Sequence, residues 1–422
     1  MRPERGRVQF DRRSSGAHGV KGVEDAAGTE VASSVVDLPD ACSPGAMTTP
    51  DGFADQIVRW QMSHGRHTLP WQNTSDPYRV WLSEIMLQQT QVATVIEYYS
   101  RFLTRFSTVA ELAEAGDDTV MGLWGGLGYY TRARNLHRCA QQVVALHGGQ
   151  FPSTAAELQT LPGIGRSTAA AIASFCFGER VAILDANVKR VLTRVLGFSA
   201  DLAKTANERT LWDKATELLP STAVKQSMPR YTQGLMDLGA TICSGRQPKC
   251  LLCPVQTSCR ASAEGNPEKY PVKTRTLKRS EQPLSLLLLQ RPDGACWLEK
   301  RPAPGIWGGL FCLPVFANDE ALKAFLPSSL HARLQPLPPR THVLTHKDLH
   351  LSPWQAKLLY MQAMPFLEDA GIASGTWFSP PQWAGLGLPA PIRKLLEQHA
   401  SDSEETSLAI QDSAGKMASS SR

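Results

Sequence analysis

The chain has 422 residues, 42% of them hydrophobic, and a formal net charge of +5. This length is enough for two or three domains, each with its own core. The longest apolar run, residues 284–289, is far too short to cross a bilayer, so we expect no membrane role. A mildly basic chain is compatible with a polyanionic partner, although charge alone does not identify one.

Both ends of the chain are predicted to be disordered. Residues 1–46 are rich in Arg, Gly, Ser and Ala without a sustained hydrophobic period, and residues 401–422 are rich in Ser. Acidic residues within the first segment argue against a transit peptide. Met47 stands just before the first periodic helix, and we hypothesise that the mature protein begins there.

Residues 47–262 are expected to form a helical domain, because apolar residues recur at spacings of three and four between turns marked by Gly and Pro. Glu84 is a candidate general acid in this domain. Burial raises the pKa of a carboxyl and keeps it protonated near neutrality, as a general acid requires. The alternative is an exposed glutamate on an ordinary helix face. Burial is expected because the helical neighbours of Glu84 are apolar apart from one amide: Val80, Trp81, Leu87 and Gln88.

A tight turn between two helices is predicted at residues 161–168, which read LPGIGRST. Two glycines around one apolar residue leave backbone N–H groups at a helix N-terminus free to bind a phosphate without reading base sequence. Lys189, Arg190 and Arg194 on the next predicted helix add positive charge. Such a turn is otherwise an ordinary helix connector.

Asp185 is the second candidate catalytic carboxylate. It ends an apolar run between the predicted turn and the next helix. A carboxylate beside a phosphate-binding turn would stabilise an oxocarbenium-like sugar cation. The alternative role of Asp185 is the N-cap of the helix that follows.

Four of the nine cysteines form the pattern Cys243-x6-Cys250-x2-Cys253-x5-Cys259. Four thiolates on one loop can converge on a soft metal centre, and the clustering argues for a reducing compartment rather than a disulfide framework. Zinc and plain reduced cysteines are the alternatives. The predicted helical turn upstream favours iron and sulfur over zinc.

A second, α+β domain is expected at residues 283–400, joined to the first by a polar and basic connector at residues 263–282. Asp293 and Gly294 predict a hairpin turn within it. The expected strands and the closing helix are Leu284–Leu289, Cys296–Lys300, Leu310–Val315, His342–Leu351 and the helix Ile392–His399.

The turn, Asp185 and the four-cysteine loop, in this order, resemble the endonuclease III superfamily of DNA glycosylases. Within it, the MutY family of adenine glycosylases is similar in residues 69–71 (LPW), 81–92 (WLSEIMLQQTQV) and 124–136 (WGGLGYYTRARNL). The resemblance runs from about residue 53 to about residue 399. It implies a multidomain fold class: an all-α helix-hairpin-helix core with a [4Fe-4S] cluster loop, followed by an α+β Nudix-like C-terminal domain.

The resemblance implies base excision repair by an adenine-specific N-glycosylase acting on adenine mispaired with 8-oxoguanine or guanine. Glu84 would protonate the adenine ring so that it leaves as a neutral base. Asp185 would stabilise the sugar cation or attack it to form a transient covalent intermediate. Water activated by deprotonated Glu84 would complete the hydrolysis. The four cysteines would hold the [4Fe-4S] cluster.

Adenine inside a duplex is unreachable, so the enzyme must extrude it. Gln89 and Tyr129 match the wedge and intercalating positions of the family, and Trp71 would line the base pocket. Apart from the resemblance, Trp71 could be simple core and Tyr129 a loop anchor. The other expected contacts to DNA are Gln88, Leu161, Gly163, Gly165, Ser167, Asn187, Lys189, Arg190, Thr345 and His346.

Ser167 distinguishes this chain from bifunctional relatives. Those enzymes carry a lysine at the matching place, and its amine attacks the sugar as a Schiff-base nucleophile. A serine hydroxyl cannot form that linkage. We therefore expect a monofunctional glycosylase.

Residues 300–311 (KRPAPGIWGGLF) resemble the Nudix-like C-terminal domain of the MutY family. No Arg-Glu-x-x-Glu-Glu helix follows them, so the metal-binding carboxylates of a Nudix hydrolase are missing, and we expect a recognition module. Thr345 and His346 match a Phe-Ser-His turn that reads 8-oxoguanine in the family. Leu344 stands where the family has the aromatic residue.

The expected partner is double-stranded DNA containing adenine mispairs, bound by a monomer with no membrane association. We expect a cytoplasmic, nucleoid-associated bacterial enzyme. One alternative is a glycosylase for oxidised pyrimidines or mismatched thymine, against which Ser167 and the second domain argue. The other is a non-catalytic DNA-binding or redox-sensing iron–sulfur protein, against which the pair of Glu84 and Asp185 argues.

Overall fold

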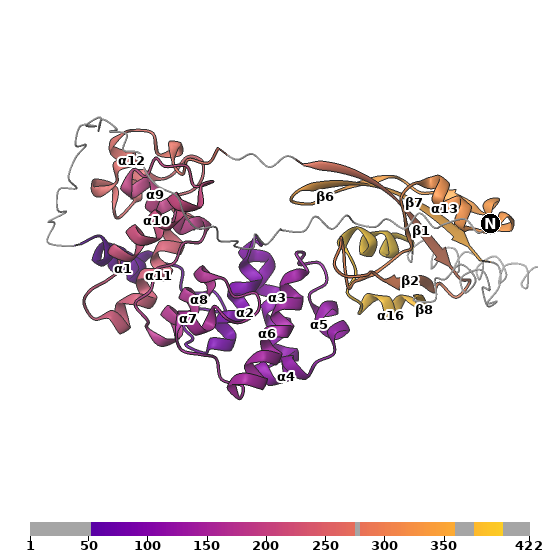
Figure 1. Cartoon of the computed structure of the whole chain (residues 1–422), viewed down its shortest axis with the longest axis horizontal. Helices are drawn as coiled ribbons and strands as arrows, with labels where there is room; N and C mark the ends of the chain where they lie inside the picture. Colours follow the sequence, from indigo (N-terminus) through magenta and orange to yellow (C-terminus); the bar gives the residue numbers. More distant parts are fainter. Residues whose placement is uncertain (1–51, 275–278, 359–374, 400–422) are drawn as a thin grey trace, which may run out of the picture.

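The computed structural model describes residues 52–274, 279–358 and 375–399, which form a helical domain and a sheet domain side by side (Figure 1). The predictions of disorder for residues 1–46 and 401–422, and of a mature start at Met47, concern residues outside these ranges. Within the three described ranges, no helix is both long enough and apolar enough to span a membrane.

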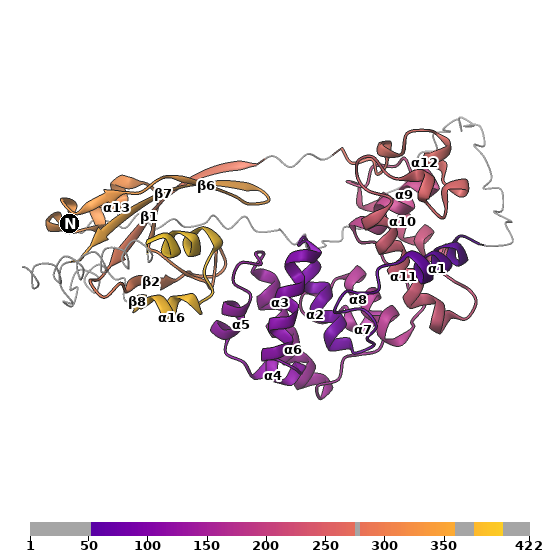
Figure 2. The same ribbon diagram turned by 180° about the vertical axis from the view of Figure 1, so that it is seen from behind.

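The helical domain has no strand within residues 52–274, as the spacing of its apolar residues predicts. α1 packs against α11 at the end far from the sheet domain (Figure 2). The helices of this domain are α1 (Phe53–His64), α2 (Pro77–Leu87), α3 (Val92–Arg105), α4 (Val109–Glu114), α5 (Asp117–Leu123), α6 (Thr131–His147), α7 (Ala155–Leu158), α8 (Arg166–Ile172), η1 (Ala173–Phe177), α9 (Ala186–Leu196), α10 (Thr205–Glu217), α11 (Val224–Thr241), η2 (Cys250–Leu252), η3 (Gln256–Ser258), α12 (Arg260–Ala263) and η4 (Pro267–Lys269).

Two hydrophobic cores meet inside the helical domain. The first lies among α2 to α6 and includes the fully buried Trp81 and Trp124. The second lies among α1, α9, α10 and α11 and includes Ile57 and Leu238. α8 and η1 contribute to both cores. α2, which carries Glu84, belongs to the first core, and α9, which Asp185 precedes, belongs to the second.

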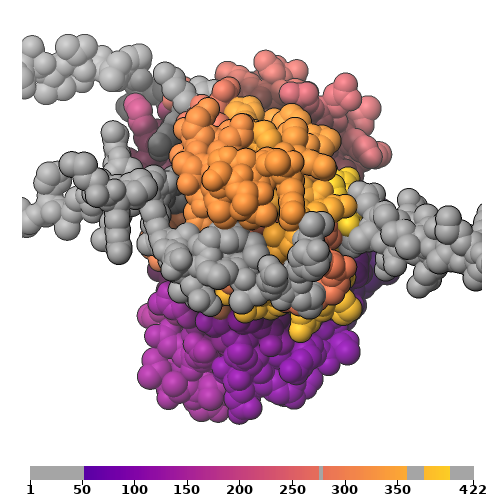
Figure 3. Space-filling model, turned by 90° about the vertical axis from the view of Figure 1, so that its right-hand side faces the viewer, coloured from indigo at the N-terminus to yellow at the C-terminus, as the bar shows by residue number. Residues whose placement is uncertain are grey.

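The sheet domain is built on β1 (Ser280–Gln290), which pairs in parallel with β7 (Lys347–Lys357) along its whole length. β1 pairs antiparallel with β2 (Cys296–Lys300) and β4 (Val315–Phe316), so the sheet is mixed. Figure 3 views the molecule from the end of this domain, with the N-terminal helices below it. The remaining elements are β3 (Phe311–Cys312), α13 (Asp319–Phe325), α14 (Ser328–His331), β5 (Leu334–Pro336), β6 (Arg340–Val343), β8 (Gly375–Phe378), α16 (Pro380–Ala384) and a helix over residues 390–399.

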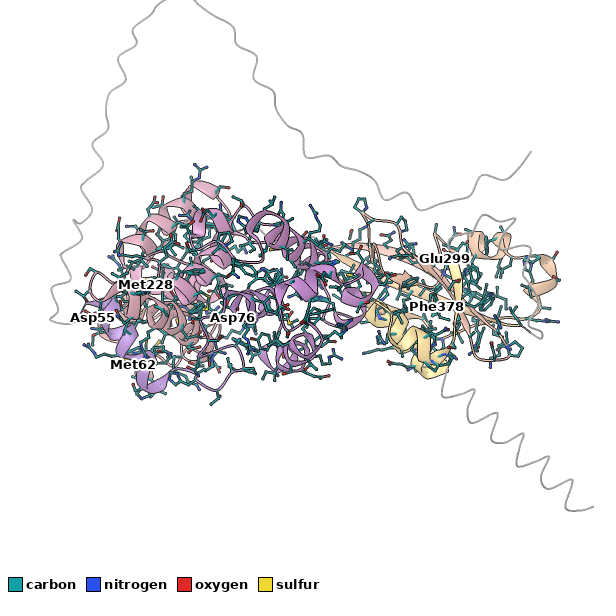
Figure 4. All side chains as sticks on the ribbon, turned by 90° about the horizontal axis from the view of Figure 1, so that it is seen from below. Asp55, Met62, Asp76, Met228, Glu299 and Phe378 are labelled. Atoms are coloured by element: carbon teal, nitrogen blue, oxygen red, sulfur yellow. The ribbon has the colours of Figure 1, made fainter. Side chains whose placement is uncertain are left out.

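The sheet is covered by aromatic pairs as well as aliphatic side chains. Phe378 of β8, labelled in Figure 4, meets Phe311 of β3 edge to face, with ring centroids 5.2 Å apart. Trp297 of β2 and Trp377 of β8 make a similar contact at 5.4 Å. Such pairs add to the stability that the buried area itself provides.

The structure corrects three sequence predictions in this domain. The strand expected at Leu310–Val315 is split into β3 and β4. The strand expected at His342–Leu351 is a hairpin of β6 and β7, closed by a hydrogen bond from Leu344 N to Lys347 O at 2.8 Å. The expected connector is shorter than residues 263–282, because Tyr270 is buried against the helical domain and β1 begins at Ser280.

Candidate active site

Glu84 lies on α2 at the wall of a cavity of about 540 Å³, called the Glu84 cavity here. α2 begins cleanly because Asp76 caps it, accepting from Tyr78 N at 2.9 Å, and Pro77 occupies its first turn. Leu87 and Trp71 line the same cavity. The helical neighbours Val80 and Trp81 are buried, as their spacing predicts, but most of the side chains that line the cavity are polar.

The Glu84 carboxyl is held in its neutral form near pH 7. Burial, together with a smaller contribution from the Asp185 carboxylate, raises its pKa to about 8. The charge of Asp185 acts on Glu84, so the two residues that the sequence proposes as catalytic belong to one electrostatic environment.

Asp185 is the N-cap of α9, so the alternative role raised from the sequence is real. Its side chain accepts from Val188 N at 2.7 Å and from Asn187 Nδ2 at 3.3 Å. Burial raises the pKa of Asp185, and these hydrogen bonds oppose that shift. Capping fixes the direction of the carboxylate, so the cap and a catalytic role are compatible.

Ser167 ties the helical turn to the segment that presents Asp185. Its Oγ accepts a hydrogen bond from Leu184 N at 2.8 Å. Gly163, with φ of +77°, lies against Asn135, and a Cβ there would lie 2.7 Å from the Asn135 Cβ. Leu161 is buried, and its carbonyl accepts from Ile164 N at 3.2 Å, so it shapes the turn from inside.

A second cavity of about 540 Å³, the hairpin cavity, lies over this turn. It gathers several residues that the sequence assigns to DNA binding, together with Arg166, whose guanidinium stacks 3.9 Å from the centre of the Trp212 ring. Gln88 joins α2 to α8 through a hydrogen bond to Thr168 Oγ1 at 3.4 Å. The predicted residues in its wall are Gln88, Gly163, Gly165, Ser167 and Lys189.

The cations of α9 point in different directions. Lys189 lines the hairpin cavity and forms an ion pair with Glu208 of α10. Arg190 donates from Nε to Cys243 O at 2.7 Å and from Nη2 to Asn187 Oδ1 at 2.9 Å. Contact of Lys189, Arg190 and Asn187 with DNA stays a prediction.

Arg194 does not supply surface charge, contrary to its sequence interpretation. It is 2% exposed and donates to Ser244 O at 2.6 Å and Gly245 O at 3.0 Å. Its Nη1 also lies 3.3 Å from Cys243 Sγ. Arg194 therefore anchors the cysteine loop to α9, because a buried guanidinium needs fixed acceptors.

The four cysteines surround one enclosed apolar space whose walls include Val191, Leu238 and Val255. The thiols are close enough to raise one another's pKa values at Cys253 and Cys259, where burial is the larger cause. In the described ranges, no three His, Cys, Asp or Glu side chains converge on a point as a single metal ion requires. A multi-iron cluster spaces its thiolates farther apart, because each binds a different iron.

Gln89 and Tyr129, the predicted wedge and intercalating residues, are both exposed and both have left-handed backbones, with φ of +56° and +48°. A side chain in this region is strained by about 1–2 kcal/mol. Both residues lie in short loops beside Arg132 of α6: Gln89 lies in the loop after α2, and Tyr129 lies in the loop before α6. The sequence did not single out Arg132, although an arginine directly after an aromatic-glycine loop is a usable signal.

Arg66, which lines the Glu84 cavity, forms an ion pair that the sequence did not reveal. Arg66 donates from Nε to Asp237 Oδ1 at 2.6 Å and from its backbone N to Oδ2 at 2.9 Å. Asp237 is fully buried and also accepts from Gln233 Nε2 at 2.9 Å. An aspartate within the apolar periodicity of α11 is the signal that could have indicated it.

A third cavity, of about 490 Å³, lies between the two domains and is called the interdomain cavity. Tyr129 of the helical domain and Thr345 of the sheet domain meet there, with their hydroxyl oxygens 3.2 Å apart. His346, Leu344 and Trp307 complete much of its wall. The structure therefore brings the predicted recognition turn to the predicted intercalating residue.

Residues 82–217 match the HhH-GPD superfamily base excision DNA repair proteins, and residues 285–398 match the NUDIX domain. An adenine DNA glycosylase of Buchnera aphidicola from Acyrthosiphon pisum is 36% identical over 347 residues, covering 82% of this chain and 97% of the relative. The human adenine DNA glycosylase is 43% identical over 219 residues, covering 50% of this chain and 39% of the relative. A solved thermostable thymine-DNA glycosylase is 28% identical with a TM-score of 0.44, covering 50% and 95% of the two chains. Since the bacterial relative is matched nearly end to end, this chain belongs to the adenine DNA glycosylase family of base excision repair.

Proposed function

We propose that this adenine glycosylase removes adenine placed opposite 8-oxoguanine or guanine in duplex DNA, and that it cleaves only the N-glycosidic bond. The observation that carries the proposal is the carboxyl of Glu84, which lines a cavity and whose pKa is raised to about 8 by burial and by the charge of Asp185. Cleavage of a glycosidic bond needs an acid that protonates the departing nucleobase and an anion that stabilises the sugar cation.

In this mechanism the extruded adenine enters the Glu84 cavity beside Trp71. Glu84 donates its proton to a ring nitrogen, and the electron pair of the glycosidic bond passes to the departing base. Asp185 stabilises the resulting sugar cation or bonds to it transiently. Water then adds to the sugar carbon and returns a proton to Glu84, which restores the enzyme.

Two observations support excision without strand cleavage and recognition of the opposite base. The residue at the position of the bifunctional lysine is Ser167, whose hydroxyl is engaged with Leu184 N. The interdomain cavity presents Thr345 and His346 next to Tyr129, in reach of a base pair that Tyr129 enters. Hydroxyl and imidazole groups can donate or accept hydrogen bonds to an altered purine.

Cys243, Cys250, Cys253 and Cys259 are proposed to hold a [4Fe-4S] cluster. Their arrangement around one enclosed apolar space fits a group that is held by four thiolates. When bound, the cluster would be a structural and redox centre that fixes the loop. Arg190 and Arg194 would keep that loop against α9 and hence against Asp185.

The protein is further proposed to act as a monomer on the nucleoid in the cytoplasm of a bacterium. The near full-length match to a bacterial enzyme supports this setting. Its DNA contacts would include the hairpin cavity, where backbone N–H groups and Lys189 would meet phosphates without reading sequence.

The test is single-turnover cleavage of duplexes with adenine opposite 8-oxoguanine, guanine or thymine, with alkali added afterwards to reveal abasic sites. Wild type should excise adenine from the first two only, and strand breaks should require alkali. Glu84→Gln should abolish excision while DNA binding persists. Absence of excision from every adenine mispair by cluster-loaded protein would overturn the proposal.

A further inference from the structure

Arg132 makes an unusually dense set of contacts for a side chain outside the proposed chemistry. It is 9% exposed. Its Nη1 donates to three carbonyls at the end of α2: Ile85 O at 2.9 Å, Met86 O at 2.8 Å and Gln88 O at 2.7 Å. Its Nη2 donates to Thr90 Oγ1 at 3.0 Å and to Leu127 O and Gly128 O, each at 3.3 Å.

These acceptors belong to two separate loops. Gln88 and Thr90 flank Gln89, whereas Leu127 and Gly128 directly precede Tyr129. The guanidinium also stacks at 5.4 Å from the centre of the Tyr129 ring. One side chain therefore bridges both loops that are proposed to enter the duplex.

The backbone at both loop tips requires such a bridge. Gln89 and Tyr129 have positive φ, a conformation that non-glycine residues keep only when their surroundings enforce it. The Gln89 side chain is exposed, and Tyr129, although half exposed, has its ring against Arg132 and its hydroxyl beside Thr345. The planar guanidinium of Arg132, which binds carbonyls of both loops, can enforce this conformation. A lysine ammonium cannot reproduce the geometry of the guanidinium.

We propose that Arg132 is a positioning residue that sets Gln89 and Tyr129 at a fixed separation, so that both enter the duplex together and extrude the adenine. This inference rests on the proposed function and deepens it. Arg132 acts on extrusion, before bond cleavage; because Ile85 and Met86 directly follow Glu84 on α2, the pH dependence of the variant must be measured as well.

The primary test uses Arg132→Lys, which keeps the charge, with Arg180→Lys as the matched control. Arg180 also donates to two backbone carbonyls, those of Pro220 and Leu219, but touches neither loop. We expect Arg132→Lys to lower the single-turnover excision rate about 100-fold, as misplacement of a positioning group by about 1 Å can. Arg180→Lys should stay within about twofold of wild type.

Two readouts separate positioning from general damage. In a Tyr129→Ala background, Arg132→Lys should cost much less than in wild type, because residues that act together are not additive. The rate of Arg132→Lys should still fall above the same pH as wild type, because Glu84 is undisturbed. Equal losses in both backgrounds, or a displaced pH break, would overturn the inference.

Extrusion can be followed without excision, by the fluorescence of 2-aminopurine placed opposite 8-oxoguanine. Wild type should raise the fluorescence on binding, and Arg132→Lys should bind without that rise. If wild type extrudes but never excises adenine, the proposed function fails while the inference on Arg132 survives. If Arg132→Lys does not fold, Thr90→Val serves instead, because valine is similar in size to threonine but lacks the hydroxyl that accepts from Arg132. Thr90→Val should show a smaller loss of the fluorescence rise and of the excision rate.

Discussion

Glu84 illustrates how a single carboxyl obtains the proton that the proposed reaction requires. Its helix places it at the wall of the Glu84 cavity, and desolvation raises its pKa far above that of a glutamate in water. The second carboxyl, Asp185, raises the pKa further, so one group remains neutral beside the other. This is the division of roles expected where two carboxyls act as acid and anion.

The pH dependence of excision should follow the protonation of Glu84. Because the acid form is active, the single-turnover rate should be constant below the Glu84 pKa of about 8 and fall about tenfold per pH unit above it. Rates measured from pH 6 to 10 on a duplex with adenine opposite 8-oxoguanine would show the break. A break at the ordinary pKa of a glutamate would contradict the assigned role.

Substitutions of Asp185 should separate its role as the N-cap of α9 from the role of its negative charge. Asparagine caps helices about as well as aspartate, so Asp185→Asn should reduce the excision rate at least about 100-fold while thermal unfolding is nearly unchanged. Asp185→Ala should lose activity and, in addition, about 1 kcal/mol of stability. Thermal unfolding and single-turnover rates of both variants would check this. Full activity in Asp185→Asn would show that only the cap matters.

At the scale of elements, α9 connects the site to both of its supports. Its N-terminus presents Asp185, its middle reaches the cysteine loop through Arg190 and Arg194, and its outer face carries Lys189. The pairing of Lys189 with Glu208 of α10 means that a phosphate must compete with a carboxylate for this cation. On the proposal that Lys189 binds a phosphate, Glu208 of α10 would weaken binding to any DNA, specific or not.

Glu208→Gln should accordingly strengthen non-specific duplex binding. Releasing Lys189 would add about one phosphate contact, so the slope of log affinity against log salt should steepen by about 0.9. Fluorescence anisotropy titrations between low and moderate salt would measure it. Glu217→Gln, the same charge change at an exposed position of the same helix, is the control and should leave the slope unchanged. Equal effects of both variants would rule out a specific role for the ion pair.

At the scale of the whole molecule, the two domains share more than a linker. Buried residues of the sheet domain such as Leu310 and Leu388 belong to the same continuous core as Trp124 of the helical domain. Tyr130 donates across the boundary to Leu388 O at 3.0 Å, and Arg134 donates to Gly308 O. The interdomain cavity is therefore walled by packed elements rather than by a loose junction.

Thr345→Ala should reduce discrimination between opposite bases. Loss of the hydroxyl that meets Tyr129 should slow excision opposite 8-oxoguanine several-fold and leave excision opposite guanine close to wild type. The measurement is the ratio of the two single-turnover rates. Thr341→Ala on β6, outside the cavity wall, is the matched control. An equal slowing on both substrates would place Thr345 in general DNA binding instead.

The local features of this protein were determined by the sequence. Short-range spacing predicts the helical domain without strands, the burial of Glu84 on α2, the tight turn around Gly163 and the capping position of Asp185. These follow because helix periodicity, glycine conformation and side-chain capping depend on residues within a few positions of one another. The family resemblance added the chemistry, and comparison with relatives confirmed the adenine glycosylase assignment.

Only the tertiary structure decided which distant groups meet. The burial of Arg194, the Arg66–Asp237 pair and the bridge made by Arg132 all depend on elements far apart in the chain. Sequence spacing cannot distinguish a surface arginine from a buried one, because both extend from amphipathic helices. Whether the guanidinium meets solvent, phosphate or a carbonyl is set by the packing of neighbouring elements, which supplies the fixed acceptors that a buried charge requires.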